Sequence, residues 1–226
     1  MRGLSCAFSL FAFVVTAALA NTEKTIFIAP SAIILPHSGA SLNALQLDTL
    51  TPADSALRTA IPVLFPSADH PKGHESWYLL RGLKAGQRHE IRICWAAIQP
   101  TEFWLDVYNI THVFDTPNLI QSLAAFAEEQ ASSSQAVAKF DPSAETILLL
   151  HVRAAADYFT TNRSLMLQPE PVDVDIILDP YLLNVFPASL LSTAIYLVVL
   201  AVGGWYLSGK IWRLLQPNSE SKIHQE

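Results

Sequence analysis

The sequence predicts a mainly β fold: a β-sandwich-like domain with one short helix, followed by a single C-terminal transmembrane helix. Short segments that alternate apolar and polar residues are separated by turn-forming residues, which is typical of stacked antiparallel sheets. A stretch without any charged residue, 187–209, lies near the C-terminus. Hydrophobic residues make up 51% of the chain and charged residues 15%, whereas soluble domains are about 25% charged.

The N-terminal residues 1–20 have the pattern of a signal peptide. Arg2 supplies a positive start, an apolar run follows over 4–17, and the small residues Ala18 and Ala20 suit a signal peptidase. The run is short for a membrane span. We therefore expect cleavage after Ala20, with an uncleaved N-terminal anchor as the alternative.

Residues 187–209 are long enough to cross about 30 Å of hydrocarbon at about 1.5 Å per residue. Trp205 and Tyr206 lie at its C-terminal end, as in an aromatic belt, and Lys210 and Arg213 follow at once. A cleaved signal and the positive-inside rule both place the N-terminal side in the lumen.

The same segment could instead be a GPI-anchor signal, which would end in its hydrophobic stretch. Here residues 210–226 follow that stretch, and bulky residues 181–183 precede it. We therefore predict a retained transmembrane helix with a short cytosolic tail over 210–226.

The remaining residues, 21–182, are expected to form one lumenal domain. This region has 18 acidic and 10 basic residues, a net charge of −8, which argues against nucleic acid or an anionic membrane surface as its ligand. Cys6 leaves with the signal peptide, so Cys94 cannot form an intrachain disulfide. Since exported domains usually carry disulfides, this favours residence early in the secretory pathway.

The clearest strand pair flanks the sequence Lys84-Ala85-Gly86-Gln87. Residues 88–95 alternate charged residues with Ile and Trp, the pattern of a half-buried strand, and Gly86 permits a turn. We therefore predict a hairpin of 76–83 with 88–95. Further strands are expected at 24–29, 102–108, 145–152 and 172–178.

A helix is expected to begin at Thr116-Pro117, because Thr suits a helix cap and Pro the first helical position. Apolar residues continue at helical spacing from Leu119 to Ala127. The low-complexity segment 131–138 is expected to be a loop, and 36–74 to be irregular apart from an apolar stretch at 61–65.

We predict no catalytic residue, no cofactor and no metal. No Gly-x-Ser-x-Gly elbow or phosphate-binding glycine loop is present. His70, His74 and Glu75 lie close in sequence, but zinc needs three or four ligands and nothing nearby completes the set. Cys94, between Ile93 and Trp95, is expected to be buried as a small hydrophobe.

Two sequons, at Asn109 and Asn162, are candidate N-glycosylation sites in a lumenal domain. Asn162 lies in a polar turn and is the better candidate, whereas Asn109 directly follows a predicted strand.

Aromatic residues are dense between Arg92 and Tyr108, and most must pack in the core. Alternation leaves some of them on the outer face, and exposed aromatic residues beside arginine are typical of protein interfaces. The candidate partner-binding residues are Arg92, Trp95, Phe103 and Trp104.

Several short motifs, together with the layout of the chain, resemble one protein family. The motifs are 21–27 (NTEKTIF), 75–80 (ESWYLL), 92–97 (RICWAA) and 99–103 (QPTEF), with a signal before them and one span after them. They resemble the fungal accessory, non-catalytic subunit of GPI mannosyltransferase 2, the second mannosyltransferase of GPI-anchor assembly.

The resemblance implies a single-pass type I protein of the endoplasmic reticulum membrane without catalytic residues of its own. It also implies a polytopic catalytic partner that adds the second mannose to the GPI precursor from dolichol-phosphate mannose. The tail departs from a retrieval signal, because 222–226 lacks the two lysines. Residence would then depend on the partner or the span.

Two other classes remain open at this stage. A type I cargo receptor or adaptor shares the topology, but it usually has a lumenal disulfide, a coiled coil and coat-binding tail signals. An enzyme is the third possibility, and it lacks a recognisable set of nucleophile, base and orienting group.

Overall fold

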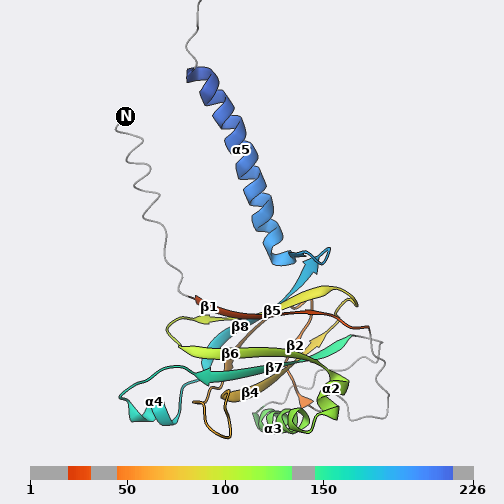
Figure 1. The fold of residues 1–226 in the computed structure, drawn as a ribbon, viewed down its shortest axis with the longest axis vertical. Helices are drawn as coiled ribbons and strands as arrows, with labels where there is room; N and C mark the ends of the chain where they lie inside the picture. Colours follow the sequence, from red (N-terminus) through yellow and green to blue (C-terminus); the bar gives the residue numbers. More distant parts are fainter. Residues whose placement is uncertain (1–19, 32–44, 134–145, 216–226) are drawn as a thin grey trace, which may run out of the picture.

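The computed structural model describes residues 20–31, 45–133 and 146–215. Residues 1–19 of the predicted signal peptide and 216–226 of the predicted tail lie outside the described residues. The described chain forms two stacked β-sheets, with helices on one side and one long helix leaving from the other (Figure 1).

Sheet A, the sheet next to the long helix, has the strand order β1-β5-β8-β3. Its neighbours are all antiparallel, and the short strand β9 pairs with the end of β8. Its strands are β1 (Ala20–Ile28), β3 (Ala56–Ile61), β5 (Arg88–Ala96), β8 (Val172–Leu182) and β9 (Phe186–Pro187).

Sheet B has the order β2-β4-β7-β6, with β2 parallel to β4 and the other pairs antiparallel. Its strands are β2 (Thr49–Leu50), β4 (His74–Arg81), β6 (Thr101–Asn109) and β7 (Ile147–Ala156). Together the two sheets confirm the mainly β, two-layer fold that the sequence predicts.

The main core lies between the two sheets, because alternate residues of each strand point to the same layer. In β5 the inward residues are Ile91, Ile93 and Trp95, and in β8 they include Ile176 and Leu178. They meet Tyr78, Leu80, Leu148, Leu150 and Val152 from sheet B.

A second core lies on the outer face of sheet B, under α2 (Ile110–Asp115) and α3 (Pro117–Ser133). Trp77 and Leu79 of β4 pack there against Leu123 and Phe126 of α3. Strand β4 is thus buried on both faces, which explains its run of consecutive apolar residues from Trp77 to Leu80.

The long helix α5 (Leu191–Leu215) follows the short 3₁₀ helix η2 (Ala188–Leu190) and projects away from the β domain (Figure 1). The segment Ala188–Leu215 is long and apolar enough to cross a membrane, and its apolar stretch is not buried in the protein. This helix agrees with the predicted C-terminal span and continues past Gly209.

The predicted hairpin is wrong, although both of its strands exist. Strand β4 pairs with β2 and β7 in sheet B, whereas β5 pairs with β1 and β8 in sheet A. The turn at Gly82–Gln87 therefore carries the chain from one layer to the other. Turn residues show where a chain reverses, but they do not show which strands pair. Strand β4 is buried on both faces and lies inside sheet B, between β2 and β7.

The helical elements also differ from expectation. Helix α3 begins at Pro117 as predicted, but it has 17 residues and ends at Ser133, inside the segment expected to be a loop. The rest of that segment, 134–138, lies outside the described residues. The helices α2 and α4 (Arg163–Leu167) and the strands β2 and β3 were not expected.

Candidate functional site

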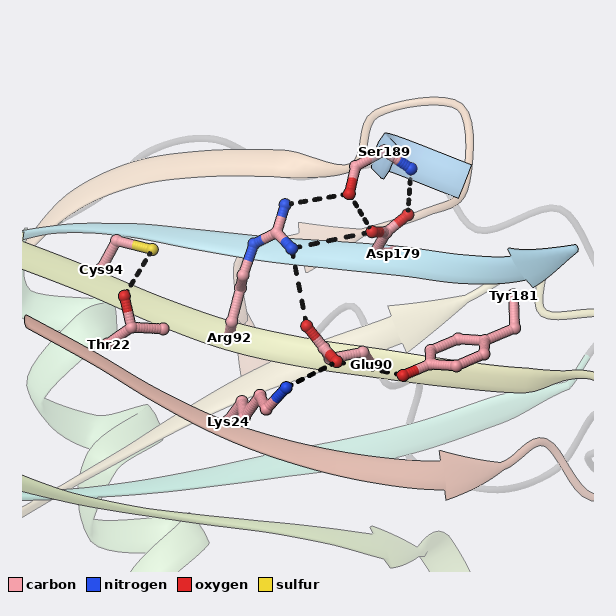
Figure 2. Close-up of polar contacts among 8 residues, drawn as sticks. All are labelled: Thr22, Lys24, Glu90, Arg92, Cys94, Asp179, Tyr181 and Ser189. Atoms are coloured by element: carbon pink, nitrogen blue, oxygen red, sulfur yellow. Dashed lines mark hydrogen bonds and ion pairs between the residues drawn. The ribbon is translucent and has the colours of Figure 1, made fainter. Parts of the chain in front are cut away.

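The outer face of sheet A carries a polar cluster at the start of the long helix (Figure 2). We call it the junction cluster. Strand β1 contributes one residue to it, β5 two, β8 two and η2 one. The members are Lys24, Glu90, Arg92, Asp179, Tyr181 and Ser189.

Arg92 lies at the centre of the junction cluster. Its Nη1 atom is 3.5 Å from Oε1 of Glu90 and 3.7 Å from Oδ2 of Asp179. Its Nη2 atom donates to Oγ of Ser189 at 3.4 Å. One guanidinium thus joins two strands of sheet A to the segment that leads into α5 (Figure 2).

The two carboxylates of the junction cluster are each only 4% exposed, yet both are well supplied with donors. Asp179 accepts from the Ser189 backbone N–H at 3.1 Å and from its hydroxyl. Glu90 accepts from the Tyr181 hydroxyl at 3.1 Å and pairs with Lys24 at 3.4 Å. The negative charges of these two carboxylates are therefore balanced by the positive charges of Lys24 and Arg92.

Burial, together with the Glu90 carboxylate, raises the pKa of Tyr181, so its hydroxyl remains a donor at neutral pH. Every polar group of the junction cluster is thus engaged with another member. The arrangement suits a rigid connection between the β domain and α5 rather than proton transfer to a substrate.

Sequence reasoning singled out Arg92 from this cluster and missed the other members. The usable signals were the alternating charges of β5, which place Arg88, Glu90 and Arg92 on one face, and a carboxylate at Asp179 shortly before the apolar stretch. The structure brings these features together through the β5–β8 ladder, in which Glu90 lies opposite Asp179.

The other candidate partner-binding residues separate into two groups. Trp95 and Phe103 are buried in the main core, where their rings meet edge to face at 4.7 Å, so the expectation of exposed aromatic residues is wrong for these two. Trp104 is half-buried on the outer face of sheet B, with Nζ of Lys72 over its ring at 5.2 Å. Partner binding by Arg92 and Trp104 stays a prediction.

A second polar cluster lies on the outer face of sheet B beside α3. The Glu75 carboxylate accepts from the Ser122 hydroxyl and is 3.1 Å from Nε2 of His151. The indole N–H of Trp77 donates to the same Ser122 hydroxyl at 3.0 Å. The His151 ring stacks on Trp77 with a centroid separation of 4.2 Å. These contacts fasten α3 to the sheet.

Hydrogen bonds from His151 and Ser122 lower the pKa of Glu75 from its ordinary value of 4.5 to about 2. A lowered pKa in the folded state stabilises the protein above pH 4.5, and this stability is lost as the pH falls towards 2. Because the Glu75 side chain is 39% exposed, solvent reduces the effect to about 1 kcal/mol.

We expect the free energy of unfolding of the wild type to fall between pH 4.5 and 2. The fall should be about 1 kcal/mol smaller in the Glu75→Gln variant. Urea unfolding in detergent at several pH values measures both. Parallel pH dependence in the two proteins would contradict this assignment.

His70, His74 and Glu75 line one pocket beside α3, but His74 and Glu75 face different side-chain partners. His74 faces Glu129 at 3.6 Å, while Glu75 faces His151. Among the residues that the structure describes, no group of three or more His, Cys, Asp and Glu side chains could hold a metal ion.

Cys94 is half-buried on the outer face of sheet A, so the expectation that it is buried in the core is wrong. Its neighbours Ile93 and Trp95 take the inward positions, and alternation turns Cys94 outward, where the Thr22 hydroxyl lies 3.5 Å from its sulfur.

Both sequon asparagines are exposed. Asn109 ends β6 and precedes α2 without a side-chain capping bond. The Oδ1 atom of Asn162 accepts from the Ser164 backbone N–H at 3.0 Å and caps α4. Glycosylation of either residue remains a prediction.

The fold and the junction cluster define a β-sandwich domain joined without a free linker to one apolar helix that could cross a membrane. The comparisons with known proteins identify the family. The chain belongs to the Pga1 family, GPI-mannosyltransferase II co-activators, whose model matches residues 11–211.

One curated relative is the GPI mannosyltransferase 2 subunit C167.09 of Schizosaccharomyces pombe. It is 24% identical over 207 residues, which cover 88% of this chain and 90% of the relative. No solved structure matches. The family favours the accessory-subunit interpretation over the cargo receptor.

Proposed function

We propose that this chain is a non-catalytic accessory subunit of GPI mannosyltransferase II in the endoplasmic reticulum membrane. The family match carries the proposal, because it extends from residue 11 to residue 211 and so includes both the β domain and most of α5. The junction cluster supports the proposal, because it bonds the β domain to the segment that leads into α5.

The proposed partner is a polytopic catalytic subunit that transfers the second mannose to the GPI precursor. Two surfaces are available to it. The helix α5 is exposed along its whole length, so a neighbouring transmembrane helix can pack on it. Trp104, with Lys72 beside it, lies on β6 at one edge of sheet B and offers an aromatic anchor to a lumenal loop.

The function can be tested by deleting the gene and profiling the GPI precursors. We expect a precursor with a single mannose to accumulate, and the full chain to restore normal lipids. A matched chimera, in which an unrelated apolar helix replaces Leu191–Leu215 and Ser189 is kept, tests whether α5 itself makes the contact. Normal precursors in the deletion strain would overturn the proposal.

We further propose that the β domain lies in the lumen and the tail in the cytosol. In that orientation both sequons can be glycosylated, and they lie on β6 and at α4, away from the junction with α5. The positive residues Lys210 and Arg213 at the far end of α5 support it.

We expect Asn109→Gln and Asn162→Gln each to remove one glycan. Each variant should therefore show a smaller mobility shift on endoglycosidase treatment than the wild type. A sequon engineered into the tail is the control and should stay unmodified. Glycosylation of the tail sequon with none on the β domain would reverse the orientation.

A further inference from the structure

The turn between β8 and β9 holds two apolar side chains out into solvent. Leu183 is 97% exposed and Val185 is 77% exposed, on either side of Asn184. The turn is four residues long, and the Val185 N–H closes it by donating to the Leu182 carbonyl at 3.1 Å. It is thus a well-formed turn with an apolar tip.

The conformation of this turn is unusual for its residues. Leu183 and Asn184 have φ angles of 53° and 59°, in the left-handed region that Gly and Asn favour and Leu does not. The Asn184 amide ties the turn to the segment at the start of β5. It accepts from the Arg88 N–H at 2.9 Å and donates to the Gly86 carbonyl at 2.9 Å. The structure therefore holds Leu183 outward at a backbone position where a polar Asn would be favoured.

The position of the turn indicates what covers it. Strand β9 and η2 follow at once, and the apolar segment begins at Ala188. Figure 1 shows this connection at the foot of α5, on the side of the β domain from which α5 leaves. If α5 spans the bilayer, Ala188 lies near the edge of the hydrocarbon. The interfacial layer extends about 5–7 Å beyond that edge.

We propose that the β8–β9 turn is a second membrane contact, in which Leu183 and Val185 insert into the boundary between lipid headgroups and acyl chains. The exposed Arg88, whose guanidinium lies over the Tyr181 ring at 5.8 Å, sits beside the turn and faces the lipid phosphates. The inference rests on α5 crossing the membrane. It adds a second point of attachment, which fixes the tilt of the β domain.

The experiment uses the full chain alone, reconstituted in phosphatidylcholine vesicles, so it does not depend on any mannosyltransferase partner. An environment-sensitive fluorophore is placed on a Leu183→Cys variant in which Cys6 is replaced by Ala and Cys94 by Ser. We expect blue-shifted emission that lipids with a doxyl group near the glycerol quench. The matched control is Phe159→Cys, a similarly exposed apolar site on the β7–α4 connection, which should give red-shifted, unquenched emission.

A second variant distinguishes loss of the membrane contact from misfolding of the turn. Leu183→Asn removes the apolar group and suits the positive φ, so the turn should remain intact. With the label on Val185→Cys, this substitution should reduce quenching by the doxyl lipids. Emission at Leu183 that is no more quenched than at Phe159 would overturn the proposal. So would shielding of the Leu183 label that occurs only after the catalytic subunit is added, since the turn would then be covered by protein.

Discussion

Replacing Arg92 with Met is expected to lower the free energy of unfolding by about 3 kcal/mol. Arg92 is the cation that faces both Glu90 and Asp179, and the substitution leaves Asp179 buried with only the donors of Ser189. The length of the Met side chain keeps most of the packing. Urea unfolding of the full-length chain in detergent, followed by tryptophan fluorescence, measures the loss.

The matched control is Arg58→Met on the same face of sheet A. Arg58 pairs with Asp175 at 2.7 Å, but the two side chains are 83% and 41% exposed. Solvent screens such a pair, so we expect a loss of stability much smaller than that of Arg92→Met. If both variants lose the same stability, the junction cluster has no special role in joining the β domain to α5.

Gly73→Ala is expected to have the largest effect of any single substitution considered, a loss of more than about 4 kcal/mol. Gly73 has a φ of 75°, and a Cβ atom there would lie 2.0 Å from the Ala154 carbonyl oxygen. That oxygen belongs to the backbone of β7 and cannot move without breaking the ladder with β4. We expect the variant chain to be degraded in cells, and its abundance measures this directly.

Gly86→Ala is the control for Gly73→Ala, because it imposes a similar positive φ on an alanine without the steric clash. Gly86 has a φ of 74°, nearly the same as Gly73, but a Cβ atom there meets nothing within 4 Å. Its expected cost is therefore about 1–2 kcal/mol, the conformational penalty alone. A similar loss of abundance in both variants would show that close packing against β7 is not the cause.

The local features of the fold were predictable because period-2 alternation sets them. The residues of β5 alternate clearly from Ile91 to Trp95, and Thr116-Pro117 marks the start of α3. Which strands pair was not predictable, since β4 and β5 share a turn but belong to different sheets. Pairing depends on contacts between distant parts of the chain. Strand β3 was missed because it lies at a sheet edge and its short sequence, ALRTAI, contains few large apolar residues.

The candidate site was predicted only in part for the same reason. Aromatic density near Arg92 marks a region, but alternation alone does not say which side is the core. Trp95 and Phe103 point inward together, whereas Arg92 and Cys94 point outward. Asp179 and Ser189 lie far from Arg92 in sequence, and only the pairing of β5 with β8 brings them close.

The connection between the β domain and α5 has a mechanical consequence. Strand β8 pairs with β9 through Tyr181 and Leu182, η2 follows directly, and Ser189 is bonded to Asp179. These bonds restrain bending between the β domain and α5. If α5 crosses the membrane as proposed, this helix, about 37 Å long, and the β domain tilt together. The tilt of α5 in the bilayer and the membrane contact proposed for the β8–β9 turn would then together set where sheet B, on the far side of the domain, lies.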